Sequence, residues 1–152
     1  MRRSISDPTI PASAVLRALM LTTLAETFGR QGHAEEGLDL VEKGLAAAEQ
    51  TGLRRISEAE LHRIKAELLM IKDVGNVAEA EQCLRTAVGV ARRQSARLFE
   101  LRATVVLARL MADQGRRDEA RTILAEIYNW FTEGFDTADL KEAKSLLDEL
   151  SA

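Results

Sequence analysis

The sequence contains few of the residues that cross-link a chain, interrupt helices or build metal sites. Its 152 residues include one cysteine, two prolines and two histidines, and aromatic residues make up only 4%. A single cysteine, Cys83, excludes a disulfide within the chain. The low content of aromatic residues argues against a β-sheet protein, in which Val, Ile, Tyr and Thr are enriched.

Charge and hydropathy also exclude classes of partner. The net charge is −3, so no overall positive field attracts the chain to nucleic acid or to an anionic membrane. The longest apolar stretches are much shorter than a membrane span. Met1-Arg2-Arg3 is followed by polar residues where an export signal has its hydrophobic region. We therefore expect a cytoplasmic protein that binds neither nucleic acid nor a membrane.

The residues that are abundant favour helices. Hydrophobic residues make up 46% of the sequence and charged residues 30%, with many Ala, Leu, Glu and Arg, a mixture typical of amphipathic helices. The length suits one domain. Pro8 and Pro11 disfavour helix in the residues before them, so we expect a flexible leader over residues 1–11 and a helical domain over residues 12–152.

Apolar residues recur at three- and four-residue steps in six successive segments, which is the spacing of one helix face. The segments pair into three helical hairpins, at about 12–52, 55–94 and 97–133. A last segment, 137–150, has the apolar stripe of a helix with one covered face, and we interpret it as a cap on the stack. Three stacked hairpins with a terminal cap helix predict an all-α solenoid.

The turns between paired helices share a register. Gly32, Gly75 and Gly115 lie 43 and 40 residues apart, and the fourth residue after each glycine is always Glu. The fifth is always small. Glycine permits turn conformations that are costly for other residues, Glu suits a helix N-terminus, and a small residue admits the preceding helix. We assign these glycines, with Gly134 before the last helix, as structural turns.

The pattern Gly-x-x-x-Glu-Ala after a Leu- and Ala-rich helix resembles the tetratricopeptide repeat (TPR) superfamily, with Gly37 in place of Ala in the first copy. Segments 59–69, 100–103, 107–110 and 128–143 are more narrowly similar to the C-terminal repeats of bacterial regulators. These regulators join a class III adenylate/guanylate cyclase or DNA-binding domain to a STAND-type predicted ATPase. Members of that group often have Gly where this chain has Ala66 and Asn129.

The resemblance implies a right-handed α-α superhelix that binds or senses. The chain has no phosphate-binding loop and no visible cyclase or helix-turn-helix segment, so we expect neither ATPase nor cyclase activity. Two readings of the resemblance remain open: a stand-alone repeat protein, or the C-terminal part of a larger regulator. In either case a protein or peptide is the expected partner, and a small-ligand sensor and a self-associating scaffold are the alternatives.

If the fold is a solenoid, the first helix of each hairpin lines its concave side, where side chains can contact a partner. An ordinary solvated face is the alternative interpretation of this groove. The candidate groove residues are Thr22, Glu26 and Arg30 in the first hairpin, Glu60, Arg63 and Glu67 in the second, and Arg102 and Arg109 in the third.

No pattern in the sequence points to catalysis, a cofactor or a metal. Cys83 lies on the apolar side of its helix and is expected to be a small buried hydrophobe. His33 and His62 do not have the close ligand spacing of a zinc site.

Two further features have structural interpretations. The aromatic residues Trp130, Phe131 and Phe135 are expected to hold the terminal helix against the last hairpin. The stretch 85–121 has nine arginines against four acids, and the segment 125–150 has seven acids against two lysines. The acidic segment can neutralise the basic one, which argues against nucleic-acid binding.

Overall fold

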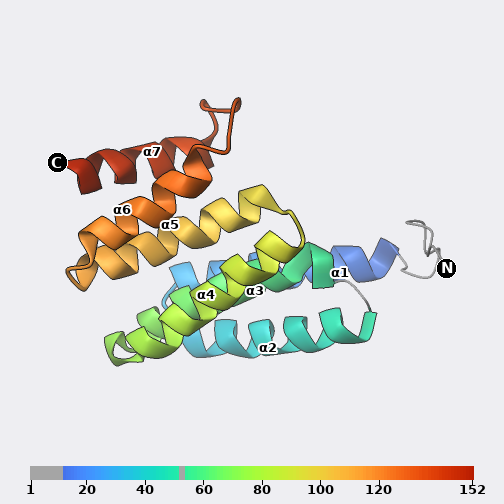
Figure 1. Ribbon diagram of the computed structural model, residues 1–152. Helices are drawn as coiled ribbons and strands as arrows, with labels where there is room; N and C mark the ends of the chain where they lie inside the picture. Colours follow the sequence, from blue (N-terminus) through green and yellow to red (C-terminus); the bar gives the residue numbers. More distant parts are fainter. Residues whose placement is uncertain (1–11, 52–53) are drawn as a thin grey trace.

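A computed structural model describes residues 12–51 and 54–152. The expected leader at 1–11 and the expected helix end at Gly52 lie outside them. Figure 1 shows that the regular elements of the described residues are all helical. They are α1 (Ala12–Arg30), α2 (Ala34–Thr51), α3 (Arg54–Lys72), the short 3-10 helix η1 (Val74–Asn76), α4 (Val77–Arg93), α5 (Arg97–Asp113), α6 (Arg117–Tyr128) and α7 (Ala138–Ser151).

The helices form a stack of hairpins. α1 packs on α2, α3 on α4, and α5 on α6. Each later odd-numbered helix also contacts both helices of the hairpin before it: α3 contacts α1 and α2, α5 contacts α3 and α4, and α7 contacts α5 and α6. The α1–α2 hairpin and α7 therefore lie at opposite ends of the stack (Figure 1). This arrangement confirms the predicted all-α solenoid of three hairpins with a terminal helix.

Of the three glycines in the turns within hairpins, two adopt the left-handed backbone that other residues avoid. Gly32 has φ 80° and Gly115 has φ 83°. After Gly32, the amide of His33 donates to the carbonyl of Phe28 at 2.9 Å, the bond that closes a Schellman motif. Ser95, between α4 and α5, closes the same motif with φ 55° although it is not a glycine.

Gly75 differs from the other two turn glycines. It lies in η1, and its φ is not left-handed. Its amide donates to Oδ1 of Asp73 at 2.8 Å, so a side chain rather than a backbone twist organises this turn. The predicted need for a backbone conformation that only glycine adopts easily is therefore confirmed at Gly32 and Gly115 and wrong at Gly75.

The small residues that follow the turns lie at close helix contacts. Ala80 and Ala120 are completely buried. A Cβ atom added to Gly37 would lie 2.9 Å from a methyl carbon of Leu68 and 3.2 Å from the carbonyl oxygen of Ala25. The small residue at Gly37 thus lets α2 approach both α1 of its own hairpin and α3 of the next one.

The connection from α6 to α7 is longer than the sequence indicated. The apolar spacing extended the sixth helix to Phe131, but α6 ends at Tyr128. Gly134 is left-handed, with φ 79°. Thr137 occupies the N-cap position of α7, but its hydroxyl donates to the carbonyl of Gly134 at 2.6 Å instead of capping the helix.

Candidate binding groove

Two adjoining pockets of about 520 and 350 Å³ run across the odd-numbered helices. Both are lined by α1, α3 and α5, and α7 closes one side of the smaller pocket. Together they bring seven of the eight predicted groove residues to one surface. These seven are Glu26, Arg30, Glu60, Arg63, Glu67, Arg102 and Arg109.

Thr22 is the predicted residue that lines neither pocket. Its hydroxyl donates to the carbonyl of Ala18, one turn earlier in α1, at 2.9 Å. A hydroxyl bonded to its own helix has little capacity left to select a ligand.

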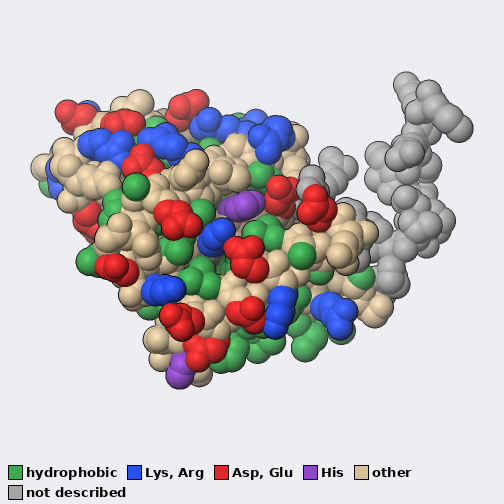
Figure 2. Space-filling model, turned by 90° about the horizontal axis from the view of Figure 1, so that it is seen from below, with side chains coloured by type: hydrophobic (Ala, Val, Ile, Leu, Met, Phe, Trp, Pro, Cys, Tyr) green, Lys and Arg blue, Asp and Glu red, His purple; other side chains and the backbone are tan. Residues whose placement is uncertain are grey.

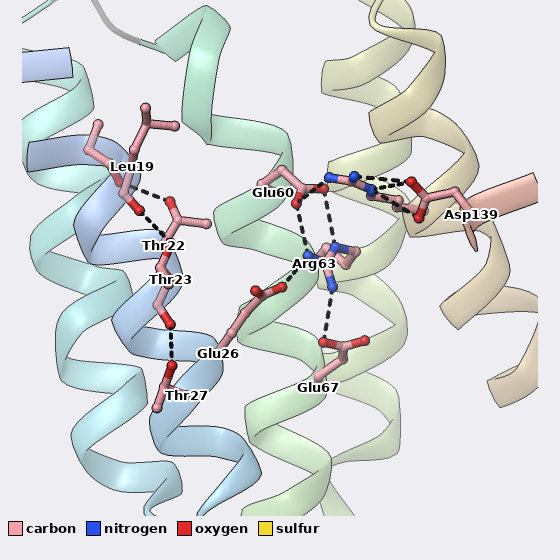
Figure 3. A network of polar contacts seen from close by, with 11 residues as sticks. Leu19, Thr22, Thr23, Glu26, Thr27, Glu60, Arg63, Glu67 and Asp139 are labelled. Atoms are coloured by element: carbon pink, nitrogen blue, oxygen red, sulfur yellow. Dashed lines mark hydrogen bonds and ion pairs between the residues drawn. The ribbon is translucent and has the colours of Figure 1, made fainter. Parts of the chain in front are cut away.

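Arg63 forms the centre of the groove wall. Its Nη2 lies 2.7 Å from Oε1 of Glu26 on α1 and 2.8 Å from Oε2 of Glu60, and its Nη1 lies 3.1 Å from Oε2 of Glu67. The side chain of Arg63 is only 10% exposed. Figure 3 shows the three carboxylates converging on this guanidinium. Such a group is fixed by its partners and cannot swing out to meet a ligand.

The network continues to α5 and α7 through Arg102. Its guanidinium donates to both carboxylate oxygens of Asp139 on α7, with contacts of 3.0 to 3.2 Å, and lies 3.4 Å from Oε2 of Glu60. Arg109 forms a second link to α7, 2.9 Å from Oε1 of Glu142. Charged side chains thus connect four helices that come from different parts of the sequence.

Burial and neighbouring charges shift the pKa values of Arg63 and Glu67. Burial by itself would lower the pKa of Arg63, but the hydrogen bonds and charges of Glu60, Glu67 and Glu26 outweigh it and raise the pKa. Burial raises the pKa of Glu67, and Glu26, Glu60 and Glu142 raise it further, while Arg63 opposes them. Burial is therefore the main reason why the pKa of Glu67 is raised.

The larger pocket adds an apolar floor and unpaired charges. Within the described residues, Arg30 on α1 and Asp113 on α5 line the pocket without forming an ion pair. Ile71 is 51% exposed in this pocket. The apolar lining consists of Ile64, Leu68, Met70, Ile71, Val106 and Leu110. An apolar surface between charged groups can accept an apolar side chain and position it by its polar neighbours.

Sequence reasoning missed the acidic side of the groove and its apolar floor. Asp139 and Glu142 belong to the acidic segment 125–150, which the sequence related to the arginine-rich stretch only through its overall charge. Their three-residue spacing places them on one helix face, but nothing local indicates that this face returns to α5. The arginines that they bind lie 37 and 33 positions earlier in the sequence.

The other candidate residues show no sign of chemistry. Cys83 is partly buried, and burial raises the pKa of its thiol, which disfavours the reactive thiolate. His33 lies 3.6 Å from Glu36 at the exposed first turn, and burial lowers the pKa of His62. Residues 12–51 and 54–152 contain no group of three or more His, Cys, Asp or Glu side chains arranged to hold a metal ion. None of the described helices is long and apolar enough to span a bilayer.

The aromatic residues near the end of α6 are only partly buried. Phe131 packs against the main core, but Trp130 is 55% exposed, and the guanidinium of Arg97 lies 5.2 Å from its ring centroid. The ring of Phe135 lies 5.8 Å from that of Tyr128. Trp130 therefore contacts the start of α5, a different role from the expected one of holding α7.

Local partners neutralise much of the arginine-rich stretch. Arg102 and Arg109 bind Asp139 and Glu142 in the acidic segment, as the charge balance suggested. Figure 2 shows basic and acidic side chains interspersed over one face of the molecule. The other ion pairs of the stretch among the described residues are Arg85 with Glu81 and Glu119, Arg92 and Arg97 with Glu100, Arg116 with Glu81 and Glu119, and Arg121 with Asp118.

Comparison with known proteins supports the fold. The family model described as a tetratricopeptide repeat matches residues 101–126, which cover most of α5, the turn at Gly115 and most of α6. No match was found among curated proteins or solved structures. Together, the stacked hairpins and this match show a TPR-like helical solenoid. The finer likeness to cyclase and ATPase regulators stays a prediction.

Proposed function

We propose that this chain is a non-catalytic protein-interaction module that holds a segment of a partner protein in the groove across α1, α3 and α5. The observation that carries the proposal is the pairing of a fixed charged wall, centred on Arg63, with an open apolar pocket beside it. TPR repeats generally mediate interactions between proteins, and the family match supports the same role. A preorganised wall costs little entropy when the partner binds.

The two parts of the groove have different tasks. The apolar floor around Ile71 supplies affinity by burying a partner side chain, because apolar burial drives association. Arg30 and Asp113 at the edge supply selectivity, since unpaired charges favour one orientation of the segment. The exposed edge residues thus contact the partner, and Arg63 holds the groove wall in place.

A photo-crosslinking amino acid placed at Ile71 tests the proposal. We expect it to capture a partner that the same amino acid at Val74, which is 75% exposed and lines neither pocket, does not capture. Arg30→Glu and Arg109→Glu should abolish capture, and Arg93→Glu on α4 should leave it intact. Equal capture from Ile71 and Val74 would show that the groove is not the binding surface.

The resemblance in segments 59–69 and 128–143 suggests a setting for the module. The proposal places it in the bacterial cytoplasm, as a stand-alone or C-terminal part of a signalling ATPase or cyclase regulator. A cyclase or ATPase reading frame next to this coding sequence, whose product co-purifies with the chain, would support this setting. If co-purification persists in Arg30→Glu and Arg109→Glu, the chain associates with that regulator through a surface other than the groove.

A small-ligand sensor is the second candidate, favoured by the size of the larger pocket. A volume of about 520 Å³ lies within the range of small-molecule sites. A ligand that binds the folded chain raises its melting temperature, so a metabolite screen by thermal shift tests this reading. The stabilisation should disappear in Arg30→Ala if the ligand occupies this pocket.

A further inference from the structure

Helix α1 differs from the first helices of the later hairpins because nothing precedes it in the described stack. On α3, Leu61, Ile64 and Leu68 are each only 1% exposed, because they pack into the α1–α2 hairpin. On α1 the buried residues are Ala25 and Gly29, near its C-terminal end. The exposed large side chains of α1 are Leu16 (59%), Leu19 (51%), Met20 (54%) and Leu24 (43%).

The composition of α1 is that of a covered helix. From Ala12 to Ala25, Arg17 is the one charged residue. The hydroxyls of Thr23 and Thr27 donate to the carbonyls of Leu19 and Thr23, at 3.0 and 2.8 Å, so they need no water (Figure 3). A helix that is apolar around its circumference is normally buried, and these back-bonded hydroxyls would lose little on burial.

The exposed residues form a regular surface. Leu16, Met20 and Leu24 are spaced by four residues and make one ridge, centred on Met20. Leu19, Thr23 and Thr27 continue the neighbouring ridge with the same spacing. Two such helices pack by setting the ridge of one into the groove of the other. The first ridge has a large side chain at each of its three positions, so a two-fold axis near Met20 can set the ridge of each copy into the groove beside the ridge of the other.

The other end of the stack does not offer a matching surface. On α7 the apolar residues Leu140, Ala143, Leu146 and Leu150 are buried against the last hairpin. Its exposed side presents charged residues, among them Lys141, Glu142 and Lys144. Head-to-tail addition would bury the leucines of α1 against these charges. Pairing of α1 with α1 avoids that cost.

From these observations we infer that α1 is the interface of a two-fold homodimer. In this dimer Met20 of each copy meets Met20 of the other, and Leu16 of each copy packs beside Leu24 of the other. The charged groove lies outside this ridge, so the dimer presents two grooves. Linked grooves let a partner with two binding segments engage both, which increases its avidity.

Sedimentation equilibrium from about 1 µM to about 1 mM covers the affinities expected of a small helical interface. The expected result is a shift from the monomer mass to twice that mass as concentration rises. Met20→Glu places two like charges together on the axis and should weaken the dimer at least about tenfold. Leu98→Glu, an exposed leucine on α5, is the matched control and should leave dimerisation unchanged.

Cross-linking provides a second readout. In a Cys83→Ala background, Met20→Cys should be joined into a covalent dimer by a short bis-maleimide, and Leu98→Cys should not. A monomer at all concentrations, or a dimer insensitive to Met20→Glu, would overturn the proposal. So would a chain that dimerises only after residues 1–11 are removed, or one whose α1 binds lipid vesicles through Met20 while remaining monomeric.

Discussion

Arg63 on α3 and Glu26 on α1 form an ion pair of 2.7 Å that joins the inner helices of the first two hairpins. The same guanidinium neutralises Glu60, whose side chain is 9% exposed. The pair is thus part of the packing between hairpins as well as part of the groove. Removing Arg63 leaves the buried carboxylate of Glu60 with only its longer contact to Arg102, at 3.4 Å.

Arg63→Ala should therefore lower the free energy of unfolding by about 3–5 kcal/mol, the usual cost of breaking one side of a buried ion pair. Urea denaturation followed by circular dichroism measures it. Arg109→Ala removes the exposed pair with Glu142 and should cost no more than about 1 kcal/mol. Similar losses in both variants would contradict the structural role of Arg63.

Glu67→Gln should change the pH dependence of stability. The pKa of Glu67 is raised in the folded chain, so the folded state binds its proton more readily than the unfolded state. This penalises folding at neutral pH, and the penalty disappears as the pH falls through the raised pKa towards the ordinary value of about 4.3.

We therefore expect Glu67→Gln to be most favourable relative to the natural chain at neutral pH and to lose that advantage on acidification. Urea denaturation of both proteins between about pH 4 and pH 7 follows the difference. Glu126→Gln, on α6 outside the groove, is the control. A difference that grows towards acid pH would mean that the pKa of Glu67 is lowered.

Two helical glycines should respond oppositely to alanine. At Gly89 an added Cβ meets nothing closer than an Arg93 guanidinium nitrogen at 3.6 Å, so Gly89→Ala should stabilise by about 0.5–1 kcal/mol through helix propensity. Gly37→Ala gains the same propensity but must displace buried Leu68. We expect it to be less stable than Gly89→Ala by about 1–3 kcal/mol. Thermal unfolding of the two variants side by side decides this.

The turn glycines should also be unequal. Gly115→Ala forces a left-handed backbone on alanine and should cost about 1–2 kcal/mol. Gly75→Ala needs no such backbone and has only to move the carboxylate of Asp73, 3.3 Å from the new Cβ, so a smaller loss is expected. Denaturation midpoints compare them, and equal losses would refute the distinction between the two turns.

Local patterns predicted the helical hairpins because apolar spacing and turn glycines act within a few residues. The same patterns placed Glu26, Arg63 and Arg102 on the inner helices. Glu60 and Glu67 lie three and four residues from Arg63 on the same helix. The local patterns did not reveal the third carboxylate, since Glu26 reaches Arg63 from 37 positions away. The early end of α6 at Tyr128 was also missed, because Trp130 and Phe131 continue the apolar spacing without continuing the helix.

The chain of ion pairs from Glu26 through Arg63, Glu60 and Arg102 to Asp139 has a mechanical consequence. A helical solenoid normally bends like a spring, because each repeat rests only on its neighbours. In this chain, straightening the solenoid would separate the ion-paired side chains of α1, α3, α5 and α7. The solenoid should therefore be rigid, with a nearly constant distance between its first hairpin and α7.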